Sequence, residues 1–397
     1  LHNLAYLRNL CVCPASWACD WMAGFFLVCV VGFILFKLFY FAWTILRYFD
    51  PIKHALSKRH ELKRAGDWAI ITGSTDGIGR AFAEELASDG LNIFLISRNA
   101  EKLLHVSQNL EHEQKVQTKY FVADFTKGDF YEALKREIDA LSSVACLINN
   151  VGMSQICAGP IATCEFLSTE FIQRMIFCNA ISTACMTRIT MPKMLLSYEK
   201  DPKHPPCIIN MSSVSAIYPR PYKSLYAACK SFVQNFSASV SGETRGLLDT
   251  RIRFLTLTPG FVWTPSRGEK KVNFFKPTPE LFANSALGMI GVASQCCGFM
   301  PHELMVFGLG LLPGYLRDWV IAKFELKQRE KFQLHEKAQL LRRLSPPVHS
   351  TFSPTAKSFT DGLVIPRPVT PRCLKAMLYV LPGYPSDLMQ QEGYGWP

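Results

Sequence analysis

The sequence predicts an α/β protein with a doubly wound parallel sheet, preceded by a transmembrane helix. Three observations lead to this prediction. From Asp67 onward, short apolar runs alternate with amphipathic helical stretches. A glycine-rich turn joins the first apolar run to the first amphipathic stretch. Before them, the stretch from Trp21 to Leu46 contains a single charged residue, Lys37.

The N-terminal part divides into an N-terminal segment (1–20), a transmembrane helix (21–46) and a basic linker (47–66). A helix crosses a bilayer with about 20 apolar residues, and a lysine near one boundary can extend its amine to the membrane surface. The alternatives are a buried core helix and a cleaved signal peptide, and the length of the run favours the membrane helix over both. The linker is rich in Lys and Arg, and the basic side of a membrane helix usually stays in the cytosol. The rest of the chain is therefore expected to face the cytosol.

Residues 67–275 are expected to form a catalytic domain that binds NADP(H). Its strands are mostly free of charge in their interiors and are separated by helices, which is typical of a parallel sheet covered on both faces. The expected strands are Trp68–Thr72, Asn92–Ser97, Lys119–Ala123, Ala145–Asn149, Cys207–Met211 and Ile252–Thr258. The expected helices are Ile78–Ser88, Glu101–His112, Asp129–Leu141, Thr169–Leu196 and Ser224–Arg245.

The C-terminal third departs from this alternation. Residues 276–344 are apolar and helical in character, which indicates a cap over the substrate, a membrane-associated region, or both. A second full crossing is disfavoured because Pro313 and Gly314 interrupt the apolar run. Residues 345–397 hold nine of the 24 prolines with little periodicity, so they are expected to be a mostly disordered tail.

The composition limits the classes of partner that are expected. A formal net charge of +11 suits an anionic partner: the phosphates of a cofactor, an acidic substrate or a membrane surface. No recognised nucleic-acid motif is present, so nucleic acid is not an expected partner. The 14 cysteines include no CxxC pair and no zinc spacing, which favours reduced, buried thiols and no metal site.

The glycine-rich turn is the first candidate site. Gly73, Gly77 and Gly79 follow a charge-free strand and precede a helix, where a backbone without side chains can approach a pyrophosphate at a helix N-terminus. An ordinary turn is the alternative. The next strand ends with Arg98 and no acid; an acid there would accept from the ribose 2′-OH of NAD, whereas a guanidinium suits a 2′-phosphate. This favours NADP(H), the alternative being an arginine that is only solvated.

Two tyrosine–lysine pairs have the spacing that places both side chains on one face of a helix. Tyr131 and Lys135 lie on a helix expected to cover the sheet, so their expected role is packing and solvation. Tyr226 and Lys230 begin the helix after the fifth strand, at the carboxyl edge where ligands of such sheets bind. Ser213 ends that fifth strand; its hydroxyl can contact a substrate carbonyl while Tyr226 donates a proton, or it can merely cap a turn.

In order and spacing, these pieces resemble the short-chain dehydrogenase/reductase superfamily, and the resemblance covers about residues 67–265. Within it, the N-terminal anchor, WAIITGSTDGIGRAFAEELASDGLNIFLISRN and LINNVGMS are similar to the microsomal 17β-hydroxysteroid dehydrogenases of types 3 and 12. The type 12 enzyme is also the very-long-chain 3-oxoacyl-CoA reductase of fatty-acid elongation. The pieces that carry the superfamily resemblance are TGSTDGIG at 72–79, Asp124, NNVG at 149–152, Asn179, Ser213, YAACK at 226–230 and PGFVWT at 259–264.

The resemblance implies a Rossmann-like fold and specific roles. Tyr226 is the general acid, Lys230 binds the nicotinamide ribose and assists Tyr226, Ser213 polarises the substrate carbonyl, and Asn179 holds a water for proton resupply. Asp124 faces the adenine and Asn150 the adenosine ribose. The implied pyrophosphate loop comprises Gly73, Ser74, Asp76, Gly77, Ile78 and Gly79, and the segment closing over the nicotinamide includes Pro259, Gly260, Val262 and Thr264.

The implied function is reduction of a lipid ketone by NADPH at the endoplasmic reticulum membrane, with the catalytic domain in the cytosol. The substrate is a long- or very-long-chain 3-oxoacyl-CoA, a 17-ketosteroid, or both, and the basic composition mildly favours the anionic acyl-CoA. The related fold often forms homodimers. A catalytically silent membrane-tethered scaffold of the same fold is the alternative, against which the intact Ser213, Tyr226, Lys230 and Asn179 argue.

Overall fold

The computed structural model describes residues 14–154, 167–246, 252–264 and 272–344, with side chains from Trp21 to Glu330. Residues 1–340 cluster as one unit and 341–397 as another. Most of the N-terminal segment and the whole expected disordered tail (345–397) lie outside the described residues.

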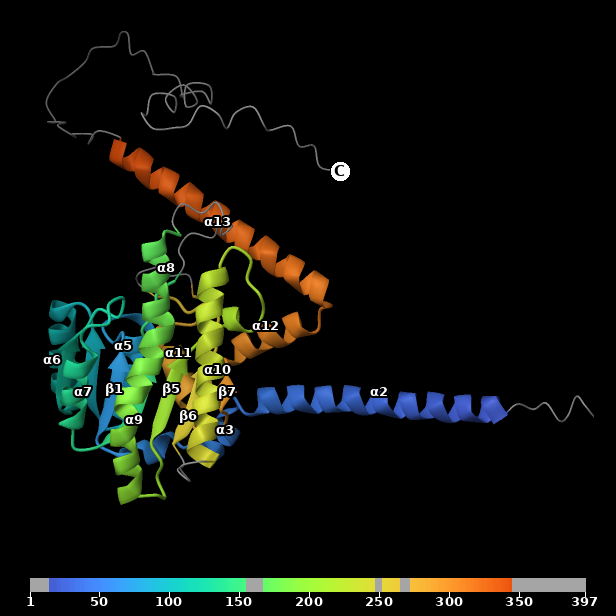
Figure 1. The fold of residues 1–397 in the computed structure, drawn as a ribbon, viewed down its shortest axis with the longest axis horizontal. Coiled ribbons are helices and arrows are strands. Elements are labelled where there is room, and N and C mark those ends of the chain that lie inside the picture. The colour runs from blue at the N-terminus through green and yellow to red at the C-terminus, as the bar shows by residue number, and fades with distance from the viewer. Residues whose placement is uncertain (1–13, 155–166, 247–251, 265–271, 345–397) are drawn as a thin grey trace, which may run out of the picture. The chain divides into compact units, whose positions relative to one another are not determined.

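The structure confirms the doubly wound parallel sheet. In the described part of the chain, seven parallel strands are arranged in the order β3-β2-β1-β4-β5-β6-β7 (Figure 1). Most of the central strands are buried along their length, because helices cover both faces. The strands are β1 (Trp68–Thr72), β2 (Asn92–Ser97), β3 (Thr118–Val122), β4 (Val144–Asn149), β5 (Cys207–Met211), β6 (Arg253–Leu257) and β7 (Gln295–Cys296).

Two helical layers enclose the sheet, each with its own apolar core. One layer contains α5 (Gly77–Ser88), α6 (Ala100–Gln114) and α11 (Pro279–Leu287), and the rings of Phe82 and Phe282 meet edge to face there at 6.4 Å. The other contains α7 (Tyr131–Asp139), α9 (Ser182–Lys200) and α10 (Ser224–Gly246), of which α9 and α10 lie in front of the sheet in Figure 1.

Two features of this domain differ from the expected elements. The helix expected over Thr169–Leu196 is divided into α8 (Thr169–Ile176), a π-helical turn η2 (Phe177–Ile181) and α9. The region after residue 276 is not wholly helical, because β7 extends the sheet. Its first helix, α11, packs into the core of the domain. A strand of two residues carries no periodicity that a sequence pattern could reveal.

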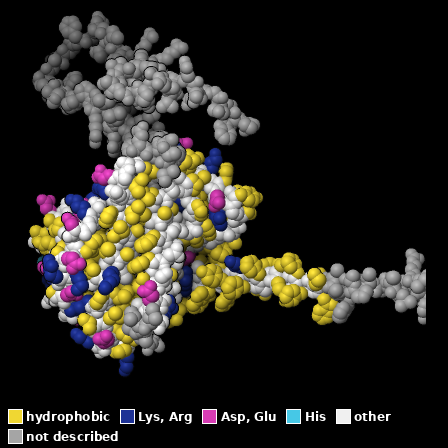
Figure 2. Space-filling model, in the orientation of Figure 1, with side chains coloured by type: hydrophobic (Ala, Val, Ile, Leu, Met, Phe, Trp, Pro, Cys, Tyr) yellow, Lys and Arg dark blue, Asp and Glu magenta, His cyan; other side chains and the backbone are white. Residues whose placement is uncertain are grey.

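The N-terminal helix α2 (Pro14–Leu46) contains the single candidate membrane span among the described residues, Trp21–Leu46, with none of it buried. Figure 2 shows hydrophobic side chains along this helix, away from the mixed charges of the catalytic domain. The linker after it folds into α3 (Asp50–Leu56), a 3-10 turn η1 (Arg59–Glu61) and α4 (Leu62–Ala65). Leu62 is fully buried, so the linker is packed against the domain.

Two further helices, α12 (Met300–Gly310) and α13 (Gly314–Leu344), follow β7 and are separated by Pro313, as the sequence predicts for an interrupted run. The beginning of α12 is held to the end of α2. One carboxylate oxygen of Glu303 accepts from Arg47 Nη2 (2.9 Å), the Tyr48 hydroxyl (3.0 Å) and the backbone N–H of Cys297 (2.8 Å). Farther along, the rings of Phe41 and Phe307 lie 4.1 Å apart.

Candidate active site

The turn from β1 to α5 has the geometry of a phosphate cradle. Gly73 and Gly77 have φ values of +66° and +54°, a region that strains residues with a Cβ. A Cβ on Gly79 would lie 2.2 Å from the carbonyl oxygen of Gly73, so the helix approaches the turn as closely as glycine allows. Asp76 caps α5 by accepting from the Gly77 N–H at 2.7 Å. The arrangement leaves partly exposed residues at a helix N-terminus, where anions bind.

The cradle is supported from β4. The side-chain amide of Asn150 donates to the carbonyl oxygens of Thr72 (3.0 Å) and Gly73 (3.2 Å), and the Thr72 hydroxyl accepts from the Asn150 N–H at 3.0 Å. Ser74 is fully buried beneath the turn, and Ile78 packs against the core. Asn150 therefore shapes the turn in addition to any contact with a ribose that the resemblance implies.

Arg98 and Asp124 follow neighbouring strands, β2 and β3. Arg98 is exposed and makes no side-chain hydrogen bond or ion pair with a residue that the structure describes. Burial opposes ionisation of Asp124, yet two hydrogen bonds from Thr126, assisted by Lys127 and Arg98, hold the pKa of this carboxyl below its ordinary value. An anionic acceptor and an exposed guanidinium thus lie at the same edge of the sheet.

Lys230 is fastened to the end of β5. Its Nζ donates to the carbonyl oxygen of Met211 at 2.8 Å, and the Ser212 hydroxyl donates to the Lys230 carbonyl oxygen at 2.7 Å. Nζ lies 5.9 Å from the centre of the Tyr226 ring, and Lys230 is 5% exposed. The start of α10 is therefore tied to the end of β5, two residues before Ser213.

Asn179 lies in the π-helical turn η2 and reaches the loop after β4. Its amide nitrogen donates to the carbonyl oxygens of Met153 (3.0 Å) and Met175 (3.1 Å), and its Oδ1 accepts from the Met153 N–H. A Cβ on Gly152 would lie 2.9 Å from Asn179 Oδ1 and 3.4 Å from Lys230 Nζ. Both polar ends thus pack against Gly152, in the space that a side chain at residue 152 would take, and π turns often occur at functional sites.

Ser213 begins a 3-10 turn, η3 (Val214–Ala216), and its Oγ accepts from the Ser215 N–H at 3.1 Å. The turn-capping alternative is therefore realised, but a hydroxyl that accepts one bond still has a proton to donate. The Val214 N–H donates to the Pro259 carbonyl oxygen at 3.0 Å, so the loops after β5 and β6 are joined.

The loop after β6 contains Pro259, Gly260, Val262 and Thr264. Val262 is buried, and the side chain of Thr264 lies so near Gly77 that a Cβ there would be 2.8 Å from its methyl. The structure therefore brings this segment beside the phosphate cradle.

A residue that sequence reasoning missed, His302 of α12, holds this loop. Its Nδ1 accepts from the Gly260 N–H at 3.2 Å, and its Nε2 lies 3.1 Å from the Phe275 carbonyl oxygen. These partners require the neutral ring with its proton on Nε2. Burial lowers the pKa of His302, although the hydrogen bonds and Glu303 oppose the shift. Nothing in the local sequence around His302 signals a partner 42 residues away.

The second tyrosine–lysine pair has other partners. Tyr131 packs on Phe125 and Phe130, and Lys135 forms an ion pair with Asp139 on the same helix. Burial raises the pKa of Tyr131 above its ordinary value. The sequence prediction of a packing role agrees with these contacts.

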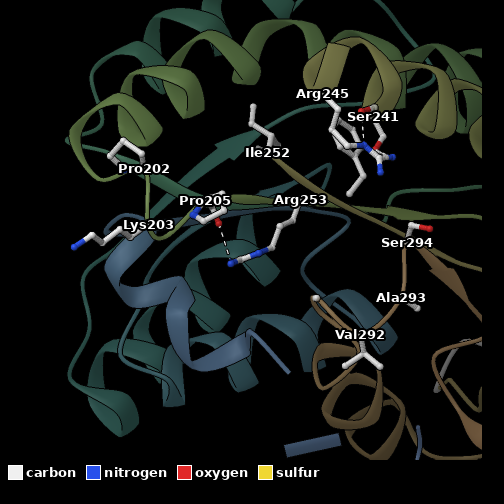
Figure 3. A pocket seen from close by; sticks show the side chains of 12 residues that line it. Pro202, Lys203, Pro205, Ser241, Arg245, Ile252, Arg253, Val292, Ala293 and Ser294 are labelled. Atoms are coloured by element: carbon white, nitrogen blue, oxygen red, sulfur yellow. Dashed lines mark hydrogen bonds between the residues drawn. The ribbon is translucent and has the colours of Figure 1, made fainter. Parts of the chain in front are cut away.

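A separate open pocket of about 750 Å³ lies at the opposite edge of the sheet. Figure 3 shows its lining side chains coming from the segment before β5, from α10 and from the start of β6. Arg253 donates there to the carbonyl oxygen of Pro205, and Arg245 bonds Ser241 on its own helix. Because parallel strands point away from this edge, the pocket is distinct from the residues around Tyr226.

Known proteins resemble the chain in sequence and fold. The family model of short chain dehydrogenases matches residues 67–273. The very-long-chain 3-oxoacyl-CoA reductase of Bos taurus is 36% identical over 253 residues, covering 63% of this chain and 77% of the relative. That of Homo sapiens is 33% identical over 270 residues, covering 68% and 82%.

Among solved structures, one described for 7beta-hydroxysteroid dehydrogenase stereoselectivity has a TM-score of 0.57 at 22% identity and covers 65% of this chain and 98% of its own. This likeness concerns the fold, which agrees with the sheet order described above. The chain therefore belongs to the short-chain dehydrogenase family and is an NAD(P)-dependent oxidoreductase.

Proposed function

We propose that the chain is a membrane-bound, NADPH-dependent ketoreductase that reduces a long- or very-long-chain 3-oxoacyl-CoA in fatty-acid elongation. The observation that carries the proposal is the convergence of Lys230 and Asn179 on Gly152, with Tyr226 beside Lys230 and Ser213 in the turn directly after β5, the strand that holds Lys230. A protein without catalytic activity would gain nothing from burying the ammonium of Lys230, which is only 5% exposed, beside the phenol of Tyr226.

The residues present fit a dinucleotide. Gly73, Gly77 and Gly79 with the start of α5 would hold the pyrophosphate, Asp124 and Asn150 the adenosine half, and the 259–264 loop the nicotinamide half. The exposed guanidinium of Arg98 suits a 2′-phosphate, which supports NADP(H) over NAD(H). When bound, a reduced nicotinamide supplies the hydride that the carbonyl carbon takes up.

Side chains of the protein would act on the carbonyl oxygen of the substrate. Ser213 would donate a hydrogen bond to the carbonyl oxygen and stabilise negative charge as it develops there. Tyr226 would transfer its phenolic proton to that oxygen, giving the alcohol. The ammonium of Lys230 would stabilise the phenolate left behind, and Asn179 would order a water through which the proton is restored.

The substrate class rests on three supports. The relatives above are named very-long-chain 3-oxoacyl-CoA reductases. The net charge of +11 suits an anionic acyl carrier. A candidate span with none of its length buried suits a substrate that partitions into membranes. A 17-ketosteroid is the second candidate, because a lipid ketone of that kind needs the same hydroxyl pair and the same anchor.

The location follows from α2 and its neighbours. Trp21–Leu46 would anchor the chain in the endoplasmic reticulum membrane, with the basic linker and residues 67–275, the catalytic domain, in the cytosol. Residues 276–344 would form a cap and a membrane-associated region. In support, Leu311 and Tyr315 at the turn between α12 and α13 are 69% and 80% exposed, and α12 is in contact with α2.

The test is a comparison of the two tyrosine variants in purified full-length protein. Loss of NADPH absorbance is followed with a long-chain 3-oxoacyl-CoA and, separately, with a 17-ketosteroid. Tyr226→Phe is expected to lower kcat by at least about 100-fold while NADPH still binds. Tyr131→Phe, the matched control on the other pair, should retain parental kcat. Activity that survives Tyr226→Phe refutes the assigned acid.

The same assay separates the ketoreductase from a silent scaffold. If the parent binds NADPH but reduces neither ketone, the scaffold is the better description. A homodimer is an expectation that sedimentation of the detergent-solubilised protein would test.

A further inference from the structure

The most buried acidic side chain in the described residues is Glu325, on α13, at 1% exposure. Its Oε1 lies 2.7 Å from Arg220 Nη1, and its Oε2 lies 2.9 Å from Lys223 Nζ. The side chains of Arg220 and Lys223 are themselves only 10% and 19% exposed. Ion pairs withdrawn from water to this degree lose hydration, so each group depends on its partners.

Both cations belong to the segment that joins the two proposed catalytic hydroxyls. Ser213 precedes the segment, and Tyr226 follows it at the start of α10. The Lys223 carbonyl oxygen accepts from the Ala227 N–H at 3.0 Å, so Lys223 supports the first turn of the helix that carries Tyr226. Between the two cations, Tyr222 has a φ of +68°, a strained conformation for a residue with a side chain. Neighbouring contacts must hold such a turn in place.

Helix α13 contacts both loops that flank the candidate active site. The Arg317 guanidinium lies 4.4 Å from the centre of the Tyr218 ring, in the same segment as Arg220. The Phe324 ring lies 5.9 Å from that of Phe261, in the loop after β6. Arg317, Ile321, Phe324 and Glu325 share one helical face, and Ile321 is 3% exposed on it.

We propose that Glu325 is a positioning residue for the reaction, which holds the 214–223 segment through Arg220 and Lys223 and so sets Ser213 against Tyr226. This rests on the proposed function. Glu325 is not assigned contact with substrate or cofactor. Without its charge, two poorly hydrated cations repel each other at a strained turn, and the distance between the serine and tyrosine hydroxyls changes. Displacements of about 1 Å at reacting groups can cost about 100-fold in rate.

The experiment compares Glu325→Gln with Glu330→Gln in full-length protein in detergent. Glu330 is exposed on the same helix and serves as the matched control. Glu325→Gln is expected to lower kcat by between about 10-fold and 100-fold, with KM and the NADPH Kd within about twofold of the parent. Glu325→Asp keeps the charge and should recover part of the lost kcat. Amide hydrogen exchange of residues 214–227 should quicken in Glu325→Gln alone.

Two outcomes overturn the proposal. The first is parental kcat together with parental exchange in Glu325→Gln. The second is a fall in kcat that is accompanied by weaker NADPH binding and by faster exchange in the distant strand β2. That pattern would indicate general unfolding. If the parent itself reduces no ketone, the proposed function fails; the exchange of residues 214–227 then decides by itself whether Glu325 holds the segment.

Discussion

At the scale of single residues, the missing side chain of Gly152 leaves space for two polar groups of the candidate site. Its position allows Asn179 and Lys230 to approach each other, since a Cβ would lie 2.9 Å from Oδ1 and 3.4 Å from Nζ. Gly152→Ala is therefore expected to displace one of these groups and to lower kcat by about 10-fold or more, because reacting groups tolerate little misplacement. The measurement is NADPH-dependent ketone reduction by the purified variant.

The matched control for this change is Gly242→Ala, in the exposed part of α10, where a Cβ meets nothing within 4 Å. Alanine is favoured over glycine inside a helix by about 1 kcal/mol, so this control should be as stable as the parent or more stable, with the same kcat. Equal activities of the two alanine variants would show that the reaction does not depend on the missing side chain at residue 152.

Arg98 is the residue to which we assign the choice of cofactor, through its charge. Arg98→Asp would place a carboxylate beside a 2′-phosphate, so the Kd for NADPH is expected to rise by at least about 10-fold while the Kd for NADH changes little or falls. Fluorescence titration of both cofactors measures this. Arg188→Asp, an equal charge change at an exposed position on α9, is the control and should leave both constants unaltered. A parent that binds the two cofactors equally would contradict the role given to Arg98.

At the scale of elements, sequence patterns predicted those whose signals are local. The runs of β1, β2 and β5 have the predicted bounds, because a charge-free run flanked by glycine or polar turns is visible in one stretch of chain. The π turn at Asn179 was not predicted, since it departs from an α-helix by hydrogen-bond register rather than by composition. Strand β7 was too short to show periodicity.

The residues of the candidate site also divide into those with a local sequence signal and those without one. Tyr226, Lys230 and the glycine turn lie next to the elements that position them, so spacing could indicate them. His302 and Glu325 act across 42 and 105 residues of sequence, and only folding brings them to the loops they hold. Gly152 is visible in the sequence as part of the NNVG motif at 149–152. Its proximity to Lys230, however, depends on the placement of α10.

The attachment of α12 to the loop after β6 gives the stability a pH dependence. The pKa of His302 is lowered in the folded protein, so below about pH 6.5 the unfolded chain binds the additional proton. The free energy of unfolding is therefore expected to fall as the pH drops from about 6.5 towards the folded pKa, by about 1.4 kcal/mol for each unit of lowering. Urea denaturation at several pH values between 5 and 8 measures the slope.

His302→Gln is expected to remove this part of the pH dependence, because glutamine can accept from one partner and donate to the other without titrating. His112→Gln is the control, at an exposed position near the end of α6, and should keep the parental slope. Parallel curves for parent and His302→Gln between pH 5 and 7 would show that the ring is not held neutral.

At the scale of the whole molecule, the start of α12 links the end of α2 to the catalytic domain. Glu303 binds the end of α2 through Arg47 and Tyr48 and also accepts from the backbone before α12. His302, its neighbour, binds the loop over the expected nicotinamide. Adjacent residues of α12 thus contact the residues that follow α2 on one side and the loop after β6 on the other, so the proposed anchor and the proposed active-site loop share a support.

Orientation in the membrane has a reporter within the chain. Asn235-Phe236-Ser237 is a glycosylation sequon, and Asn235 is exposed on α10. Because the basic linker after Leu46 favours the cytosol for the catalytic domain, Asn235 is expected to stay unglycosylated in microsomes. Ala5→Ser creates a further sequon at Asn3, before the candidate span in the sequence, and this variant should gain one glycan that endoglycosidase removes. A glycan on Asn235 in the parent, with none gained by Ala5→Ser, would place the catalytic domain in the lumen and reverse the topology.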